Sequence, residues 1–380
     1  MPLNKGYNMV NRIIISTGMA LFAMFFGAGN IVYPLTLGTS AGDHVFYAII
    51  AFLITGAGLP FLGLFSMSLY QGNYKAFFSS LGKIPSFLVI LFLAFILGPF
   101  LAIPRTETIT YQTLLPFLSI FHLSNASLFS AIYCSVLFLI SYKQNRAIDI
   151  ICTFLSPIKL TLFFILICSG LMKMQITIQN YQPISVAIRE GLSDGYATMD
   201  LLCAFFFCTA AYQNILLKVK EHRIENKKIN EIFLKSCIFA GLILGTVYIG
   251  FILIALGHAS YLRHINTVQM IQVISKLILG NFGSLFIGIC VLFACISTAT
   301  ALTDVTTQFF YETMFNKKIS RTICLIIVLI ITFFMTIIGF SGIMNIATPI
   351  LEIIYPALIV YCILIIVKKL HREKMTKNLT

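Results

Sequence analysis

Two glycines and an asparagine interrupt the first long apolar segment of the chain, in the order Gly27-Ala28-Gly29-Asn30. At membrane depth, irregular backbone survives only where it is buried in protein or lines a polar cavity. If the helix opens here, its outer half begins near Asn30 with free N–H groups that suit a carboxylate. Its inner half then ends in carbonyls, near residues 23 to 26, that suit an ammonium or a sodium ion. One break could bind both ends of an amino-acid zwitterion; the alternative is that the glycines only allow helices to pack closely.

Ionisable residues inside apolar segments are the next candidates, because a charge at the bilayer centre costs roughly 2.5 to 3.5 kcal/mol even on insertion scales. Lys159, beside Pro157, could place its ammonium near the first helix in the position of a sodium ion, and release and regain a proton. Alternatively, its side chain extends to the interface or pairs with a carbonyl. Glu352 could carry a proton or pair with Lys159. Asp200 is expected to cap a helix.

Arg105 and Glu107 follow the third apolar segment. They could guide substrate carboxylates or form an outer gate. The alternative is an exposed ion pair in a loop, which contributes little energy.

The composition of the chain is too apolar for a soluble domain. Of 380 residues, 59% are hydrophobic and 10% are charged, with a mean hydropathy of +0.95. A soluble domain has about 25% charged residues, and about 20 apolar residues cross a bilayer as a helix. The sequence therefore predicts an all-α, polytopic membrane protein. The ten predicted helices are 13–34, 44–70, 85–104, 121–142, 147–171, 196–217, 236–257, 277–303, 322–339 and 343–367.

Basic residues alternate between the two sides of these predicted helices. Twenty Lys and Arg residues fall on the side of the N-terminus and five on the other. The positive-inside rule then places both termini in the cytoplasm. The net charge of +13 follows this topology and forms no aromatic-interleaved patch, so nucleic-acid binding is not expected.

Ten helices divide into two sets of five, residues 13–171 and 196–367, followed by a basic tail at 368–380 within one transporter domain. Because five is odd, two similar halves would be inverted relative to each other, as in many transporters whose helices 1 and 6 are broken. The halves share no convincing residue repeat, so an unrelated ten-helix bundle stays open.

Several motifs, in order along the chain, resemble the branched-chain amino acid:cation symporter family (BrnQ type). They are Phe25-Phe26-Gly27-Ala28-Gly29-Asn30-Ile31-Val32-Tyr33-Pro34, Gly58-Leu59-Pro60, Gly98-Pro99, Ala102-Ile103-Pro104-Arg105-Thr106, Gly195-Tyr196-Ala197-Thr198-Met199-Asp200 and Ile354-Tyr355-Pro356. The resemblance implies bacterial uptake of leucine, isoleucine and valine, with methionine as a further candidate substrate, driven by sodium or protons. It also implies the leucine-transporter-like 5+5 inverted-repeat fold.

The resemblance further implies site residues. Substrate would bind the helix 1 break (Phe26, Gly27, Ala28, Gly29, Asn30) and helix 6 at Phe206, Phe207 and Cys208, where relatives often have a glycine. Sodium would bind between helices 1 and 8, on Ala23, Phe26, Ala294, Ser297 and Thr298, and proton-coupled proteins of this fold use a helix 5 lysine, as Lys159 would be. This chain departs from the family in ending after helix 10 where most members have twelve, and in carrying Glu107 and Glu352.

Other functions are disfavoured by what the sequence lacks. It has no His-Glu-x-x-His or Gly-x-Ser-x-Gly motif for a membrane enzyme and no Gly-x-x-x-x-Gly-Lys-Ser/Thr loop for ATP. A channel or a sensor on the same helices stays open. We expect no cofactor besides Na⁺ or H⁺, no obligate protein partner, and a location in the bacterial cytoplasmic membrane.

Overall fold

A computed structural model describes residues 2–121, 124–142, 156–174, 182–222 and 224–377, and every regular element in these ranges is a helix. A helix satisfies its backbone hydrogen bonds within the segment, which is why apolar segments in lipid adopt it. The described chain holds six long apolar helical stretches, one bent pair of helices and three shorter apolar helices. In chain order they follow the sequence of predicted helices, and the prediction of an all-helical membrane protein is confirmed.

The first predicted helix is broken where the glycines predicted it. Helix α1 (Pro2–Phe25) ends directly before the motif, α2 (Gly29–Ser40) begins within it, and the two helices are bent by 68°. The backbone between them leaves the first N–H groups of α2 without partners inside the helix.

Helix 6 differs from its prediction in both its start and its break. It begins at residue 184 as α11 (Ile184–Ala197) and continues as α12 (Asp200–Glu221). Between them Met199 has a φ of 66°, in the left-handed region that few non-glycine residues adopt. The break therefore precedes Phe206, Phe207 and Cys208, the helix 6 residues expected to bind substrate, and α12 is continuous through them. Polar residues of α11, such as Arg189 and Asp194, kept this half-helix out of an apolar segment defined by hydropathy.

Helix 3 is longer than predicted and kinked. It comprises α6 (Lys83–Phe95), η4 (Ile96–Phe100) and α7 (Ala102–Leu118), and Gly98 departs from helical geometry before Pro99. Arg105 and Glu107 therefore lie inside this helix and not in a loop. The remaining helices include α3 (Val45–Leu53), η2 (Ile54–Gly58), α4 (Leu59–Ser68), α5 (Tyr74–Phe78), α8 (Ala126–Tyr142), α10 (Ser156–Met172), α13 (Ile229–Gly257), α14 (Ala259–Leu262), η8 (Thr267–Gln269), α15 (Met270–Phe309), α16 (Arg321–Ile337) and α17 (Gly339–Lys377).

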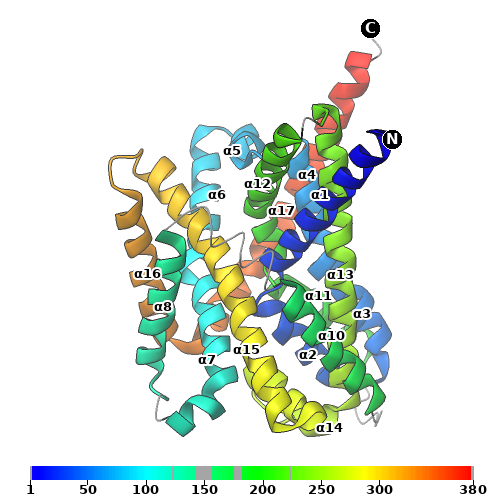
Figure 1. The fold of residues 1–380 in the computed structure, drawn as a ribbon, viewed down its shortest axis with the longest axis vertical. Helices are drawn as coiled ribbons and strands as arrows, with labels where there is room; N and C mark the ends of the chain where they lie inside the picture. The colour runs from blue at the N-terminus through cyan, green and yellow to red at the C-terminus, as the bar shows by residue number, and fades with distance from the viewer. Residues whose placement is uncertain (1, 122–123, 143–155, 175–181, 223, 378–380) are drawn as a thin grey trace.

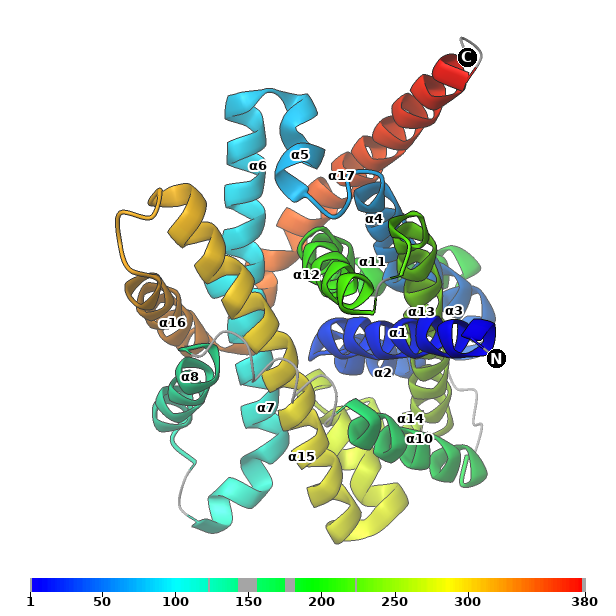
Figure 2. The ribbon, with the colours of Figure 1, turned by 45° about the horizontal axis from the view of Figure 1, so that its top comes forward.

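The helices form two groups, visible in Figures 1 and 2. In one group α1, α2 and α11 to α13 pack with α3 and α4, and in the other α6 to α8 pack with α15 and α16. Within the first group α2 packs on α11 and α1 packs on α12. The two broken helices thus lie side by side, and residues about 170 positions apart meet at their breaks.

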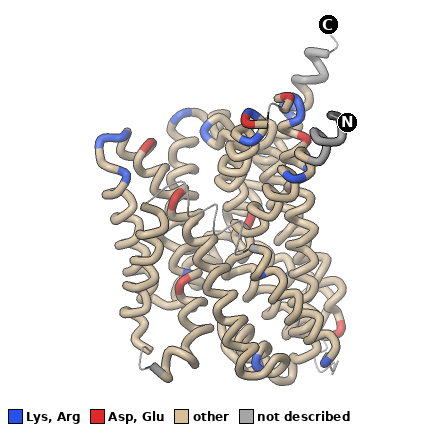
Figure 3. Tube along the Cα trace, viewed as in Figure 1, with Lys and Arg blue, Asp and Glu red and all other residues tan. Residues whose placement is uncertain are grey.

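Charged residues mark the two ends of the molecule. Helix α1 begins and α17 ends at the same end, at the top of Figure 1, where most Lys and Arg residues also gather in Figure 3. Helix α17 runs to Lys377 and so includes most of the predicted basic tail.

Candidate functional site

A small buried cavity lies where the two breaks meet. The broken helices contribute Gly27, Asn30, Thr198 and Asp200 to its wall, and Arg105 from α7 and Thr298 from α15 also line it. Its volume is about 10 Å³, room for roughly one water molecule. The cavity must widen before a branched side chain can enter.

A carboxylate network crosses from one break to the other. Asn30 Nδ2 donates to Asp200 Oδ2 at 2.6 Å, and the Tyr248 hydroxyl donates to the same oxygen at 2.8 Å. Asn30 Nδ2 also contacts the Tyr248 hydroxyl, and Asn30 Oδ1 accepts from the Gly27 N–H at 3.3 Å. The expected capping role of Asp200 is not what the structure shows, because its side chain faces Asn30 and Tyr248.

Arg105 reaches the end of α11. Its Nη1 donates to the Ala197 carbonyl at 2.5 Å and its Nη2 to the Thr198 carbonyl at 3.0 Å. These carbonyls lie at the negative end of the α11 dipole, which favours a cation. Only 4% of Arg105 is exposed, so the alternative of an exposed ion pair in a loop is wrong for this side chain.

Glu107 points away from Arg105. Residues two apart on a helix face different sides, and Glu107 accepts from the Thr336 hydroxyl at 3.2 Å and contacts the Cys134 Sγ at 3.8 Å. Glu107 lines a separate cavity of about 150 Å³ beside α8 and α16. The structure therefore does not bring the two predicted gate residues together.

Four predicted cation-coupling residues do meet: Ala23, Lys159, Ala294 and Ser297. Lys159 Nζ donates to the Ser297 Oγ at 3.0 Å and approaches the Ala23 carbonyl at 3.4 Å. Ser297 in turn lies 2.8 Å from the Ala294 carbonyl and 3.3 Å from that of Ala23. Lys159 is 1% exposed, so its ammonium stays inside the protein and does not reach an interface.

The other three predicted cation residues, Phe26, Thr298 and Glu352, lie elsewhere. The Thr298 hydroxyl donates to the Met24 carbonyl at 3.0 Å, one residue from the predicted Ala23, while Phe26 packs its ring against Phe163 at 5.4 Å. Glu352 is exposed on α17, a helix that packs on α4, α7 and α11 and not beside Lys159. The structure does not place Glu352 in the cation cluster.

The predicted helix 6 residues lie beyond the cavity. Phe207 packs edge-on against Phe25 at 5.2 Å, Phe206 packs on Tyr74 at 5.3 Å, and Cys208 faces the Leu64 carbonyl. The residues that line the cavity from this helix are Thr198, Asp200 and Cys203 instead. An acidic residue at the start of an apolar segment was the available signal for the true break, whereas nothing in the sequence distinguished Tyr248.

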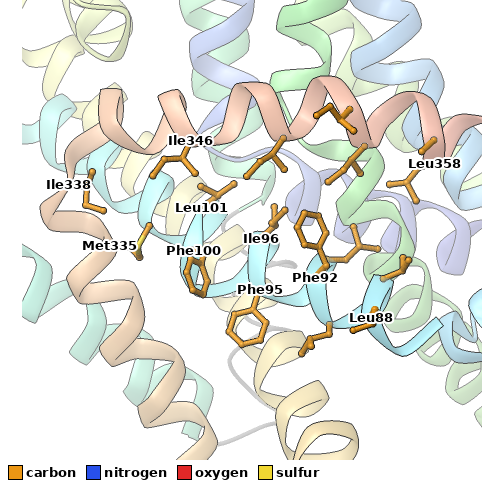
Figure 4. A pocket seen from close by; sticks show the side chains of 17 residues that line it. Leu88, Phe92, Phe95, Ile96, Phe100, Leu101, Met335, Ile338, Ile346 and Leu358 are labelled. Atoms are coloured by element: carbon orange, nitrogen blue, oxygen red, sulfur yellow. The ribbon is translucent and has the colours of Figure 1, made fainter. Parts of the chain in front are cut away.

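A much larger hollow has a different character. It measures about 970 Å³ and lies between α6, η4, α16 and α17, with only apolar side chains in its wall (Figure 4). Ile353 and Leu88 are 75% and 55% exposed there. A wall without polar groups cannot orient a charged substrate, so this groove is typical of lipid-facing surface and the small polar cavity is the better site.

Comparison with known sequences places the chain in a family. Residues 10–380 match the family model described as branched-chain amino acid transport protein. The chain is 31% identical over 360 residues to the branched-chain amino acid permease BrnQ of Bacillus subtilis (strain 168), covering 90% of this chain and 78% of the permease. It is also 31% identical over 380 residues to a putative branched-chain amino acid carrier protein of Staphylococcus aureus (strain USA300), covering 93% of this chain and 81% of the carrier.

Solved structures show the same fold. Mhp1, a nucleobase-cation-symport-1 family transporter in a closed conformation with bromovinylhydantoin bound, superposes with a TM-score of 0.63 at 15% identity, covering 89% of this chain and 74% of Mhp1. MhsT in complex with L-phenylalanine gives a TM-score of 0.62 at 15% identity, covering 86% and 80%. These neighbours confirm a leucine-transporter-like fold, and the sequence matches show that the chain belongs to the branched-chain amino acid transport protein family, a family of transporters and not of enzymes.

Proposed function

We propose that this protein imports branched-chain amino acids, with methionine as a further candidate, by alternating access driven by a cation gradient. The observation that carries the proposal is the polar cavity between two side-by-side helix breaks, in a chain of the branched-chain amino acid transport family.

The substrate backbone would bind at the breaks. The free N–H groups at the start of α2 provide donors for a carboxylate. The apolar side chain would occupy space that opens beside Phe25, Cys203 and Leu302, all of which line the cavity. Apolar contacts separate leucine from methionine by only about 1 to 3 kcal/mol, so both are expected substrates.

The coupling cation would act at Lys159, Ser297 and the Ala23 carbonyl. Lys159 brings an ammonium into this cluster, and a sodium ion beside it would face a like charge at low dielectric. This argument favours the proton as coupling ion, with Lys159 as its carrier. Loss of the proton would remove the charge that attracts the Ala23 carbonyl and so loosen α1 from α10 and α15.

The two helix groups would move relative to each other to open the cavity. Broken helices α1/α2 and α11/α12 belong to one group, whereas Arg105 and Thr298 lie in the other. Movement between the groups widens the space between these two walls without unfolding a helix.

The basic residues support an orientation with both termini in the cytoplasm. Lys and Arg gather at the end of the molecule where α1 begins and α17 ends. In a bacterial cytoplasmic membrane the positive-inside rule assigns this end to the cytoplasm.

Purified protein in sealed vesicles tests the proposal. Radiolabelled leucine, isoleucine or valine should accumulate when a proton gradient is imposed, and a sodium gradient alone should give less. Accumulation only with sodium would reassign the coupling ion. Downhill leak without gradient-driven accumulation would contradict symport and indicate a channel.

A further inference from the structure

Two opposite charges line the same small cavity without forming an ion pair. Arg105 is 4% exposed and Asp200 is 2% exposed, and both belong to its wall. The ion pairs within 4.0 Å among the described residues involve other side chains. Within the described ranges, only neutral groups compensate these two charges: Arg105 bonds the carbonyls at the end of α11, and Asp200 accepts from Asn30 and Tyr248. Burying a charge without a full opposite charge beside it costs several kcal/mol. A ligand with one charge of each sign would compensate both.

Arg105 lies where the carboxylate of an amino acid would bind. A Cβ added at Gly29 would come within 2.8 Å of Arg105 Nη2, so the guanidinium sits directly over the start of α2. A cation beside the positive end of a helix is unfavourable. An anion between them would accept from both the guanidinium and the α2 N–H groups. The buried Nε of Arg105 also has no hydrogen-bond partner in the part of the chain that the structure describes.

Asp200 lies at the other break with neutral partners. Asp200 accepts hydrogen bonds from an amide and a phenol, those of Asn30 and Tyr248, which stabilise its charge without neutralising it. An ammonium would supply the missing positive charge, and charge-assisted hydrogen bonds are roughly twice as strong as neutral ones.

We infer that Arg105 and Asp200 form a side-chain clamp for the zwitterion of a neutral α-amino acid, with the carboxylate on Arg105 and the ammonium on Asp200. The other residues of the wall are uncharged, so the site offers no third charge and a substrate side chain that is itself charged is excluded. This inference rests on the proposed function. It adds two specific side chains to the helix ends as the groups that bind the substrate backbone. The Arg105 bonds to Ala197 and Thr198 would have to lengthen as the cavity opens.

Ligands that lack one charge test the clamp. Leucinol keeps the ammonium and lacks the carboxylate, whereas 4-methylpentanoate keeps the carboxylate and lacks the ammonium. Each competes with radiolabelled leucine for the purified full-length protein, and the ratio of its dissociation constant to that of leucine is measured. Truncating one partner of a buried charge pair costs about 2 to 5 kcal/mol, or at least about 30-fold in affinity. Both ratios should therefore be about 30 or more in the parent.

Each of two variants should bring one of these dissociation-constant ratios toward one and leave the other ratio high. In Arg105→Gln the leucinol ratio falls toward one and the 4-methylpentanoate ratio stays high. In Asp200→Asn the reverse occurs. A merely structural role would weaken all three ligands together and leave both ratios unchanged, which would overturn the inference.

The matched controls are Arg321→Gln and Asp304→Asn, an Arg–Asp pair at 3.1 Å that does not line the cavity. Both ratios should stay at parental values in these variants. If a charge-removing variant is not recovered, Arg105→Lys or Asp200→Glu replaces it. Arg105→Lys should change only the leucinol ratio, and Asp200→Glu only the 4-methylpentanoate ratio.

Competition measurements on the parent protein alone can also overturn the inference. If leucinol or 4-methylpentanoate competes as well as leucine, the clamp is wrong while leucine transport stands. If the parent binds no branched-chain amino acid, the proposed function fails and the clamp with it.

Discussion

Thr298 and Arg105 occupy the space that side chains would need at Gly27 and Gly29. A Cβ at Gly27 would lie 2.8 Å from Thr298 Oγ1, and one at Gly29 would lie 3.3 Å from the Thr198 Cα. Neither glycine has a positive φ, so close approach is the reason for these residues. The packing and binding interpretations of the motif are therefore compatible, because the groups that approach the glycines also line the cavity.

We predict that Gly29→Leu abolishes uptake while the protein still inserts. The side chain would displace the Arg105 guanidinium and press on the α11–α12 junction. Leucine uptake in vesicles and the yield of membrane-inserted protein are measured together. Gly245→Ala is the control, since a Cβ there meets only Leu53 Cδ2 at 3.6 Å. Parental affinity in Gly29→Leu would refute the site.

We predict that Lys159→Ala abolishes accumulation driven by a proton gradient but retains exchange of leucine at equal concentrations. The variant loses the group proposed to carry the proton, and the cavity lining stays complete. Ser297→Ala should weaken coupling less, because it removes one of the partners of the ammonium. Lys173→Ala is the matched control, as Lys173 bonds the Ile278 carbonyl away from the cavity. Parental accumulation in both test variants under every gradient would contradict the assignment.

At the scale of elements, each break has a different cause. Between α1 and α2 small residues admit neighbouring side chains, whereas between α11 and α12 the left-handed Met199 turns the chain. A third irregularity, at Gly98 and Pro99, is supported by α15, whose Thr306 hydroxyl donates to the Ala94 carbonyl at 3.4 Å. Proline removes a backbone donor, and this hydroxyl supplies a donor to the same stretch of helix 3.

We predict that Gly98→Ala destabilises the protein by about 1 to 3 kcal/mol, the usual cost of overpacking. A Cβ at Gly98 would lie 2.5 Å from Thr306 Oγ1 and 2.7 Å from its Cγ2. Thermal inactivation of leucine binding in detergent measures the effect, with Gly245→Ala again as the control. Equal inactivation temperatures for the two variants would show that the η4–α15 contact tolerates the methyl group.

At the scale of the whole molecule, two groups of helices enclose a site that is nearly closed. The cavity of about 10 Å³ connects residues from α2, α7, α12 and α15. Since close-packed groups rearrange between discrete arrangements more readily than they deform, the site is expected to open by relative movement of the groups.

The orientation can be tested with two single cysteines at opposite ends of helix 3. Ile120 is 70% exposed beyond α7, and Lys83 is exposed at the start of α6 (Figure 1). A membrane-impermeant maleimide should label Ile120→Cys in intact cells, and Lys83→Cys only after permeabilisation, each relative to labelling of the parent. The opposite pattern would invert the topology.

The sequence and its family resemblance predicted three features of this protein. They are an all-helical membrane fold, a broken first helix, and a cluster of Ala23, Lys159 and Ser297. Hydropathy suffices for the first, because a segment that crosses lipid must be apolar and helical. For the first helix, the glycines alone left a break and close packing as alternatives. The cluster at Lys159 depended on a family resemblance and not on the residues alone.

Tertiary structure decided the rest. Hydropathy started helix 6 at residue 196 because α11 is polar, so the substrate-binding residues were expected at Phe206 to Cys208, beyond the break at Met199. Arg105 and Glu107, two residues apart, appeared to be partners, but helical geometry turns them to different neighbours. The contact of Asp200 with Asn30 and Tyr248 spans separations of 170 and 48 residues. Which polar groups meet across such distances depends on how the helices pack. A local sequence pattern does not determine that packing.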